Sequence, residues 1–148
     1  MEEGGLTSED SIKVSQILEE AGIDAIEVSG GNDFSKYVAE HNLDAIRKHI
    51  ISSEDKQSYF REHAKKLAKA ISIPVILTGG NRSGDLMNEL LNDHNIKYFG
   101  LCRTLVREPD LINKWSDGEY DVPKCITCNQ CLRTPGKRRI FNIKKEDI

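Results

Sequence analysis

Three short apolar segments, each ending at or beside glycine, constrain the fold of this 148-residue chain most strongly. They are the predicted strands at 24–29, before Gly30-Gly31, at 75–78, before Gly79-Gly80, and at 96–101, which contains Gly100. Continuous apolar runs of this length are typical of parallel strands that helices cover on both faces. The segments between the strands should therefore be helical.

Helical periodicity does occur before, between and after these strands. The first helix begins at the hydroxyl cap Thr7 and ends at Gly22. The third helix is capped by Ser83, and the fourth begins with Pro109 in its first turn. The predicted faces are Val14, Ile17, Leu18 and Ala21; Phe60, Ala64, Leu67, Ala68 and Ile71; Met87, Leu90 and Leu91; and Leu111, Ile112 and Trp115. Residues 32–54 give no clear pattern, and the whole order predicts an α/β fold with a parallel sheet.

Composition and charge exclude several classes of protein. Apolar residues make up 38% and charged residues 30%, which is too apolar for a disordered chain and too polar for a membrane protein. The acidic start at 1–5 lacks the features of a signal peptide, so a cytoplasmic location is expected. The net charge of −3 gives no general attraction to nucleic acid or to a membrane. The basic run Lys137-Arg138-Arg139 is interpreted as a solvated surface.

The glycine turns predict an anion site. Ligands bind at the carboxyl ends of parallel strands, where glycine lets backbone N–H groups approach an anion closely. Gly79 and Gly80 precede a capped helix, while Gly100 lies close to Arg103, whose guanidinium can grip a phosphate. The alternative is that the glycines only permit tight turns and that Arg103 forms a surface ion pair.

The cysteines form a second candidate site. Cys125, Cys128 and Cys131 lie within seven residues, and Cys102 precedes them. In a reducing compartment this spacing indicates a thiolate site or plain thiols rather than disulfides. Three thiolates can bind zinc or an iron–sulfur cluster. Ligand number alone favours plain thiols over an iron–sulfur cluster, and an iron–sulfur cluster over zinc.

An ordered series of segments resembles the second half of the old yellow enzyme-type NADH:flavin oxidoreductases. The resemblance extends from about Gly4 to Cys131, and its most specific parts follow the predicted strands. The matching segments are Gly4–Thr7, Glu20–Gly31, Ile73–Gly80, Phe99–Arg103, Arg107–Leu111 and Cys125–Cys131. Cys102 and Thr104 depart from the family, because many members have glycine and proline there.

The resemblance implies an FMN-binding (β/α)8 TIM barrel, of which this chain would supply the last three βα units. Residues 1–118 would form this partial barrel, and 119–148 an irregular Cys-containing C-terminal tail. The activity implied is that of an FMN-dependent NAD(P)H oxidoreductase of the ene-reductase type, acting on a small-molecule acceptor. Gly79, Gly80, Gly100 and Arg103 fall where the family binds the FMN phosphate.

The same resemblance implies that catalytic residues lie outside this chain. A (β/α)8 barrel needs about 250 residues, and the half that holds the flavin ring is not present here. His41, His49, His63 and His94 match no catalytic motif of the family. The dienoyl-CoA reductase-like members carry a 4Fe–4S cluster, but with a longer cysteine spacing and a fourth, later cysteine.

An incomplete barrel would leave open strand edges and an apolar inner face uncovered. We therefore expect the chain to pair with a missing N-terminal half or to self-associate, and to be inactive alone. The alternatives are a non-enzymatic anion- or metal-binding fragment and one partner of a split reductase. The acceptor and the choice between NADH and NADPH are not assigned.

Overall fold

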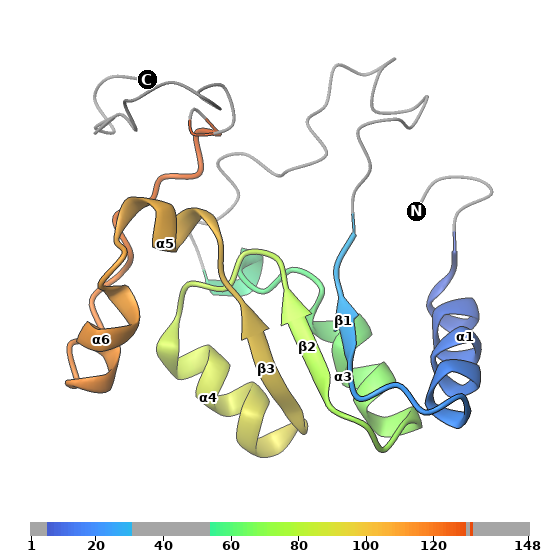
Figure 1. Cartoon of the computed structure of the whole chain (residues 1–148). Coiled ribbons are helices and arrows are strands. Elements are labelled where there is room, and N and C mark those ends of the chain that lie inside the picture. The colour runs from blue at the N-terminus through green and yellow to red at the C-terminus, as the bar shows by residue number, and fades with distance from the viewer. Residues whose placement is uncertain (1–5, 31–53, 130, 132–148) are drawn as a thin grey trace, which may run out of the picture.

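A three-stranded parallel sheet forms the centre of the computed structural model, which describes residues 6–30, 54–129 and 131. The strands β1 (Ile26–Val28), β2 (Val75–Thr78) and β3 (Ile96–Gly100) lie side by side in chain order. This confirms an α/β fold with parallel strands, which is compatible with part of a larger α/β structure (Figure 1). Closure into a barrel stays a prediction.

The helices alternate with the strands as expected, with two short additions, η1 (Glu54–Lys56) and α5 (Arg103–Arg107). Contacts join α3 to β2 and to α1, and α4 to β3. The helical elements are α1 (Ser8–Glu20), the short 3-10 helix η1 (Glu54–Lys56), α3 (Arg61–Ala70), α4 (Gly84–Asp93), α5 (Arg103–Arg107) and α6 (Leu111–Ser116). The sequence did not predict α5, because a five-residue helix is too short to display a periodic apolar face.

The core lies between the sheet and the helices that pack on one of its faces. Val75, Leu77 and Ile96 from the strands are fully buried against Leu67 of α3 and Leu90 of α4. Burial of each such side chain contributes about 1.5–3 kcal/mol. A second cluster, of Met87, Leu111 and Trp115, attaches α6 to α4. These contacts hold α3, α4 and α6 in place around the sheet.

The other face of the sheet carries Glu27, Ile76 and Tyr98 in one row across the three strands. Glu27 and Tyr98 are exposed and Ile76 is half-buried, so no described element covers this row. This face is uncovered by described elements, as expected. It is less apolar than expected, because Glu27 and Tyr98 occupy two of its three positions.

Three predicted helix boundaries are confirmed by their hydrogen bonds. Thr7 and Asp10 form a capping box, in which the Thr7 hydroxyl accepts from the Asp10 N–H at 3.1 Å. The Ser83 hydroxyl accepts from the Leu86 N–H at 3.1 Å at the start of α4. Gly22 has φ +91°, a left-handed conformation that ends α1 at low cost only for glycine.

Several expected boundaries are wrong. Strand β1 is three residues long rather than six, and Phe60 is the N-cap residue before α3, although it packs against the same core as Ala64 and Leu67. Pro109 lies before α6, because Asp110 is the residue that caps the helix. Each error falls at the end of an element, where chain geometry and not periodicity decides.

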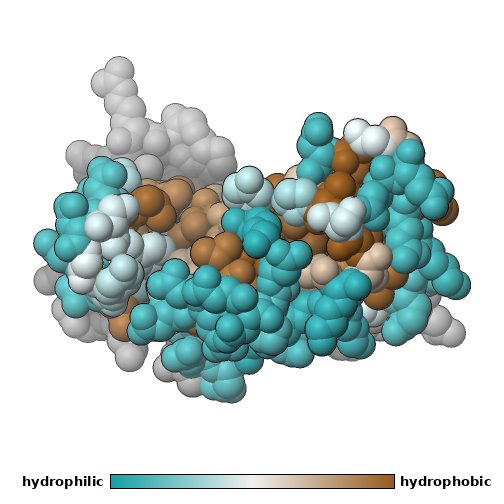
Figure 2. All heavy atoms as spheres, turned by 90° about the horizontal axis from the view of Figure 1, so that it is seen from below, coloured by the Kyte–Doolittle hydropathy of each residue, from teal (hydrophilic) through white to brown (hydrophobic). Residues whose placement is uncertain are grey.

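Part of the predicted helical core is exposed. On α1 the side chains of Val14, Ile17 and Leu18 are 42%, 64% and 41% exposed, and Leu91 and Ile112 are also partly exposed. Figure 2 shows hydrophobic residues in a hollow between hydrophilic regions and again on the side of the molecule where α1 lies. The predicted core face of α1 is therefore wrong, because α1 contacts α3 and the residues that it buries are Ser8 and Ser15.

Other predictions concern residues outside the described part of the chain. These are Gly31, residues 32–53 of the unassigned segment 32–54, which include His41 and His49, and the basic run at 137–139. Within the described ranges, none of the helices combines the length and the apolar character that crossing a bilayer requires.

Candidate functional site

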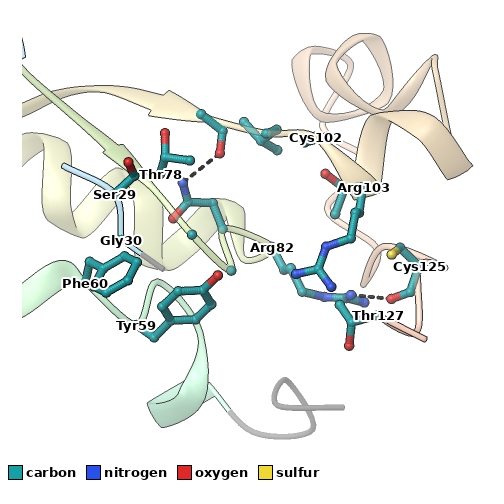
Figure 3. Close-up of a pocket in the computed structure, with 16 residues that line it drawn as sticks. Ser29, Gly30, Tyr59, Phe60, Thr78, Arg82, Cys102, Arg103, Cys125 and Thr127 are labelled. Atoms are coloured by element: carbon teal, nitrogen blue, oxygen red, sulfur yellow. Dashed lines mark hydrogen bonds between the residues drawn. The ribbon is translucent and has the colours of Figure 1, made fainter. Parts of the chain in front are cut away.

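A cavity of about 220 Å³ lies at the carboxyl ends of the three strands. Gly79, Gly80, Gly100 and Arg103 all line it, so the structure brings the four predicted residues together. Arg82 and Arg103 lie on one side of the pocket, and the rings of Tyr59 and Phe60 on the other (Figure 3). Tyr59, Phe60, Arg82 and Thr127 are lining residues that sequence reasoning missed.

The glycine pair after β2 is packed against an aromatic ring. Gly79 and Gly80 have φ of +122° and +74°, and a Cβ on either would come within 2.7 Å of the Tyr59 ring. The Ser58 and Tyr59 N–H groups donate to the carbonyls of Gly80 and Gly79 at 3.0 and 3.2 Å. Glycine is therefore required here both for the turn and for the close approach of Tyr59.

Gly100 is required by the strand next to it. A Cβ at Gly100 would lie 2.0 Å from the Thr78 hydroxyl oxygen. The Asn81 amide donates to the carbonyls of Leu77 and Gly100, at 2.6 and 3.1 Å, and accepts from the Ser58 hydroxyl at 2.9 Å. This amide ties the ends of β2 and β3 together, which holds the two glycine turns side by side.

Arg82 anchors the tail to this end of the sheet. Its side chain is 7% exposed, and its two terminal nitrogens donate to the backbone carbonyls of Cys125 and, at 2.5 Å, Pro123. Burial lowers the pKa of Arg82, Cys125 opposes this shift, and the nearby Arg103 charge adds to it. Two guanidinium groups thus lie close together in one cavity wall.

Arg103 and Glu108 hold the tail at two further points. Arg103, the first residue of α5, donates from Nη1 to the Asn129 side-chain oxygen at 2.6 Å. The buried Glu108 carboxylate accepts from the Lys124 N–H at 2.5 Å. The tail therefore folds back past the end of β3, so that Cys125 and Thr127 line the cavity beside Cys102.

Three buried polar atoms of lining residues have no hydrogen-bond partner within the described ranges: Thr78 Oγ1, Arg82 Nε and Thr127 Oγ1. Buried polar groups in native proteins almost always have a partner, from the protein, from water or from a ligand. Unpartnered donors beside two guanidinium charges favour an anion as that ligand. The arrangement can therefore bind a phosphate or a carboxylate.

All four cysteines are free thiols in the structure. Among the residues that the structure describes, no three His, Cys, Asp or Glu side chains are grouped to hold a metal ion. Burial raises the pKa of the Cys131 thiol, and the neighbouring Cys125 adds to the shift while Arg103 opposes it. The proposed ligands Cys125, Cys128 and Cys131 thus gain no support from the geometry, and their role stays a prediction.

The two described histidines lie away from the cavity. The His63 Nδ1 atom is 3.2 Å from the Ser8 hydroxyl, and the His94 Nε2 atom is 3.8 Å from the Glu89 carboxylate. Neither residue lines the cavity. No catalytic residue is assigned to this part of the chain.

The chain is similar to several characterised oxidoreductases, although no protein-family model matches it. It is 26% identical to a 4,4'-dithiodibutanoate disulfide reductase of Rhodococcus erythropolis, over 88% of this chain and 37% of the relative. It is 26% identical to an NADH oxidase of Thermoanaerobacter brockii, over 86% and 18%, and 28% identical to a bilirubin reductase of Clostridium symbiosum, over 89% and 35%. The chain thus spans little more than a third of these relatives at most.

Proposed function

We propose that this chain is the FMN-phosphate-binding part of an FMN-dependent NAD(P)H oxidoreductase of the ene-reductase type. The observation that carries the proposal is the convergence of Gly79, Gly80, Gly100 and Arg103 on one cavity at the carboxyl ends of parallel strands. The names of the relatives, a disulfide reductase, an NADH oxidase and a bilirubin reductase, support redox chemistry, and the second of these names supports NADH as the cofactor.

The residues present fit a phosphate group. Arg82 and Arg103 supply positive charge, and the hydroxyls of Thr78 and Thr127 with Arg82 Nε supply buried atoms that lack partners in the described chain. Phosphate accepts several charge-assisted hydrogen bonds at once, so it can satisfy such a set. Cavities for whole drug-sized ligands are usually about 300–1,000 Å³. A cavity of about 220 Å³ therefore fits the phosphate end of FMN and not its ring system.

The division of work follows from this size. Bound FMN supplies hydride transfer, which no side chain of this chain can perform. The residues of this chain bind the phosphate, fix its position between two glycine turns, and exclude water with the Tyr59 and Phe60 rings. Ring contacts and the acceptor site would come from a further part of the structure, in line with the 18–37% of the relatives' length that the chain spans.

The proposed fold is the last three βα units of a (β/α)8 barrel, with the remaining units on other residues or on a partner chain. One edge of β1 pairs with no strand among the described residues, and this edge and the exposed face of α1 support this part of the proposal. We expect the chain alone to bind the phosphate weakly and to have no reductase activity.

A titration of the full chain by isothermal calorimetry tests the proposal, with FMN, riboflavin and inorganic phosphate as three ligands. FMN should bind at least about tenfold more tightly than riboflavin, which lacks the phosphate. Equal affinity for FMN and riboflavin, or no binding of either, would overturn the proposal. Inorganic phosphate should bind about as tightly as FMN, because this cavity contacts only the phosphate end of the cofactor.

A further inference from the structure

We infer that the Cys-containing tail supplies a ligand contact of its own, the Thr127 hydroxyl, to the cavity at the ends of the strands. The inference rests on the proposed function, because it concerns the same anion site. It assigns the segment from Pro123 to Asn129 to the binding site as one of its walls.

The burial of Thr127 is the first observation. Its side chain is only 5% exposed, it lines the cavity, and its hydroxyl oxygen has no partner in the described chain. A buried hydroxyl without a partner destabilises the fold. A ligand oxygen that accepts a hydrogen bond from this hydroxyl would remove that cost. Thr78 contributes a second hydroxyl of this kind to the same cavity.

The backbone of Thr127 is the second observation. Its φ is +53°, in the left-handed region that β-branched residues rarely adopt. Asn129, at φ +60°, has a residue type that tolerates this conformation, but Thr127 does not. A strained residue of the less suitable type is typical of positions whose side chain is needed for binding.

The hydrogen bonds on either side of Thr127 are the third observation. The Cys125 carbonyl accepts from Arg82, and the Asn129 side-chain oxygen accepts from Arg103 at 2.6 Å. Thr127 lies midway between these two anchors, so the arginines fix the backbone on both sides of it. A hydroxyl held in this way is pre-organised, and binding costs little further ordering.

The ligand that this group fits is the terminal oxygen of a phosphate monoester. A hydroxyl can donate to an anionic oxygen at the same time as the guanidinium Nε of Arg82, which also lacks a partner in the described chain. The guanidinium groups of Arg82 and Arg103 in the same cavity favour an anionic ligand over a neutral one.

Three substitutions at one position test the inference on the full chain. Thr127→Val keeps the shape and the β-branch but removes the hydroxyl, and it should weaken binding of FMN and of inorganic phosphate about tenfold. Thr127→Ser keeps the hydroxyl and should bind within about threefold of the native chain. Thr127→Gly relieves the left-handed strain, so it should melt at the native temperature or above while binding as weakly as the valine variant.

One control variant and two possible results separate this inference from the proposed function. Ser116→Ala removes a hydroxyl that bonds only to a carbonyl within α6, and it should leave the affinity unchanged. Native chain that binds neither FMN nor phosphate would remove the proposed function itself. If the native chain binds phosphate and a fully folded Thr127→Val variant binds it with the same affinity, this inference alone is overturned.

Discussion

The guanidinium of Arg82 donates a hydrogen bond to the backbone carbonyl of Cys125, which lies 43 residues later in the chain. A second bond from the same group reaches Pro123. The residue two positions after a glycine pair therefore determines where the tail lies. The cavity at the ends of the strands and the tail consequently form a single structural unit. A substitution in one of them should change the stability or binding of the other.

Arg103 should contribute directly to anion affinity. Replacement by alanine in Arg103→Ala removes a charged donor from the cavity and should cost about 1.5–3 kcal/mol of FMN binding. Lys66→Ala, which removes an exposed charge on α3, is the matched control and should change the affinity little. Calorimetric titration of both variants measures the difference, and an unchanged affinity for Arg103→Ala would contradict the assignment.

Arg82 should matter for stability as well as for binding. Arg82→Met leaves the carbonyls of Pro123 and Cys125 without their donor and should lower the free energy of unfolding by about 2 kcal/mol. Limited proteolysis should then cut the tail faster than in the native chain. Native-like cleavage of the tail in Arg82→Met would show that other contacts suffice to hold it.

Gly100 and Thr78 should be energetically coupled. Gly100→Ala places a Cβ 2.0 Å from the Thr78 hydroxyl oxygen and should destabilise the fold by about 1–3 kcal/mol. Adding Thr78→Ala removes that oxygen and should restore part of the loss, although the Thr78 Cβ at 3.1 Å remains close. A double-mutant cycle by urea denaturation measures the coupling, and strict additivity would refute it.

The carboxylate of Glu19 should make stability depend on pH. It accepts from the Ser72 hydroxyl, from the Ser72 N–H at 2.8 Å and from the Ile73 N–H at 3.1 Å. The bond from the Ser72 hydroxyl, followed by those from the N–H groups, holds the pKa of Glu19 below its ordinary value of 4.5.

A depressed folded pKa means that the contribution of Glu19 is present above about pH 4.5 and is lost as the pH falls through the folded pKa. The difference in melting temperature between the native chain and Glu19→Gln should therefore be largest near pH 7 and should shrink below pH 4.5. Circular dichroism melts across this range measure it, and a difference that does not vary with pH would contradict the prediction.

The exposed face of α1 should drive association. Ile17 is 64% exposed beside Val14 and Leu18, so Ile17→Glu should reduce self-association with little change in the melting temperature. Lys66→Glu, an exposed change on α3, is the control for added negative charge. Size-exclusion chromatography with light scattering measures the mass, and a native chain that is already monomeric would contradict the prediction.

Local signals explain what the sequence could predict. The caps at Ser83 and Thr7 and the helix end at Gly22 all depend on residues within one helical turn, and each was predicted correctly. The capping-box bond that the Asp10 side chain accepts was not predicted. The adjacency of Gly79 and Gly100 followed from the parallel order of the strands, because neighbouring parallel strands end at the same edge.

Contacts over long sequence separations explain what the sequence could not predict. Nothing near Arg82 indicates that its partners are carbonyls some 40 residues later, since any backbone carbonyl has the same chemistry. Nothing in α1 indicates whether another element covers Ile17. The only sequence signal for this anchor was an arginine two residues beyond the glycine pair. Its burial, which shows that it is an anchor and not a surface charge, is known only from the structure.

The tail is held through main-chain oxygens, the Lys124 main-chain N–H and one asparagine amide, and none of these atoms is a sulfur. Cysteines in this segment can consequently be lost or respaced over evolutionary time without releasing the polypeptide from its place.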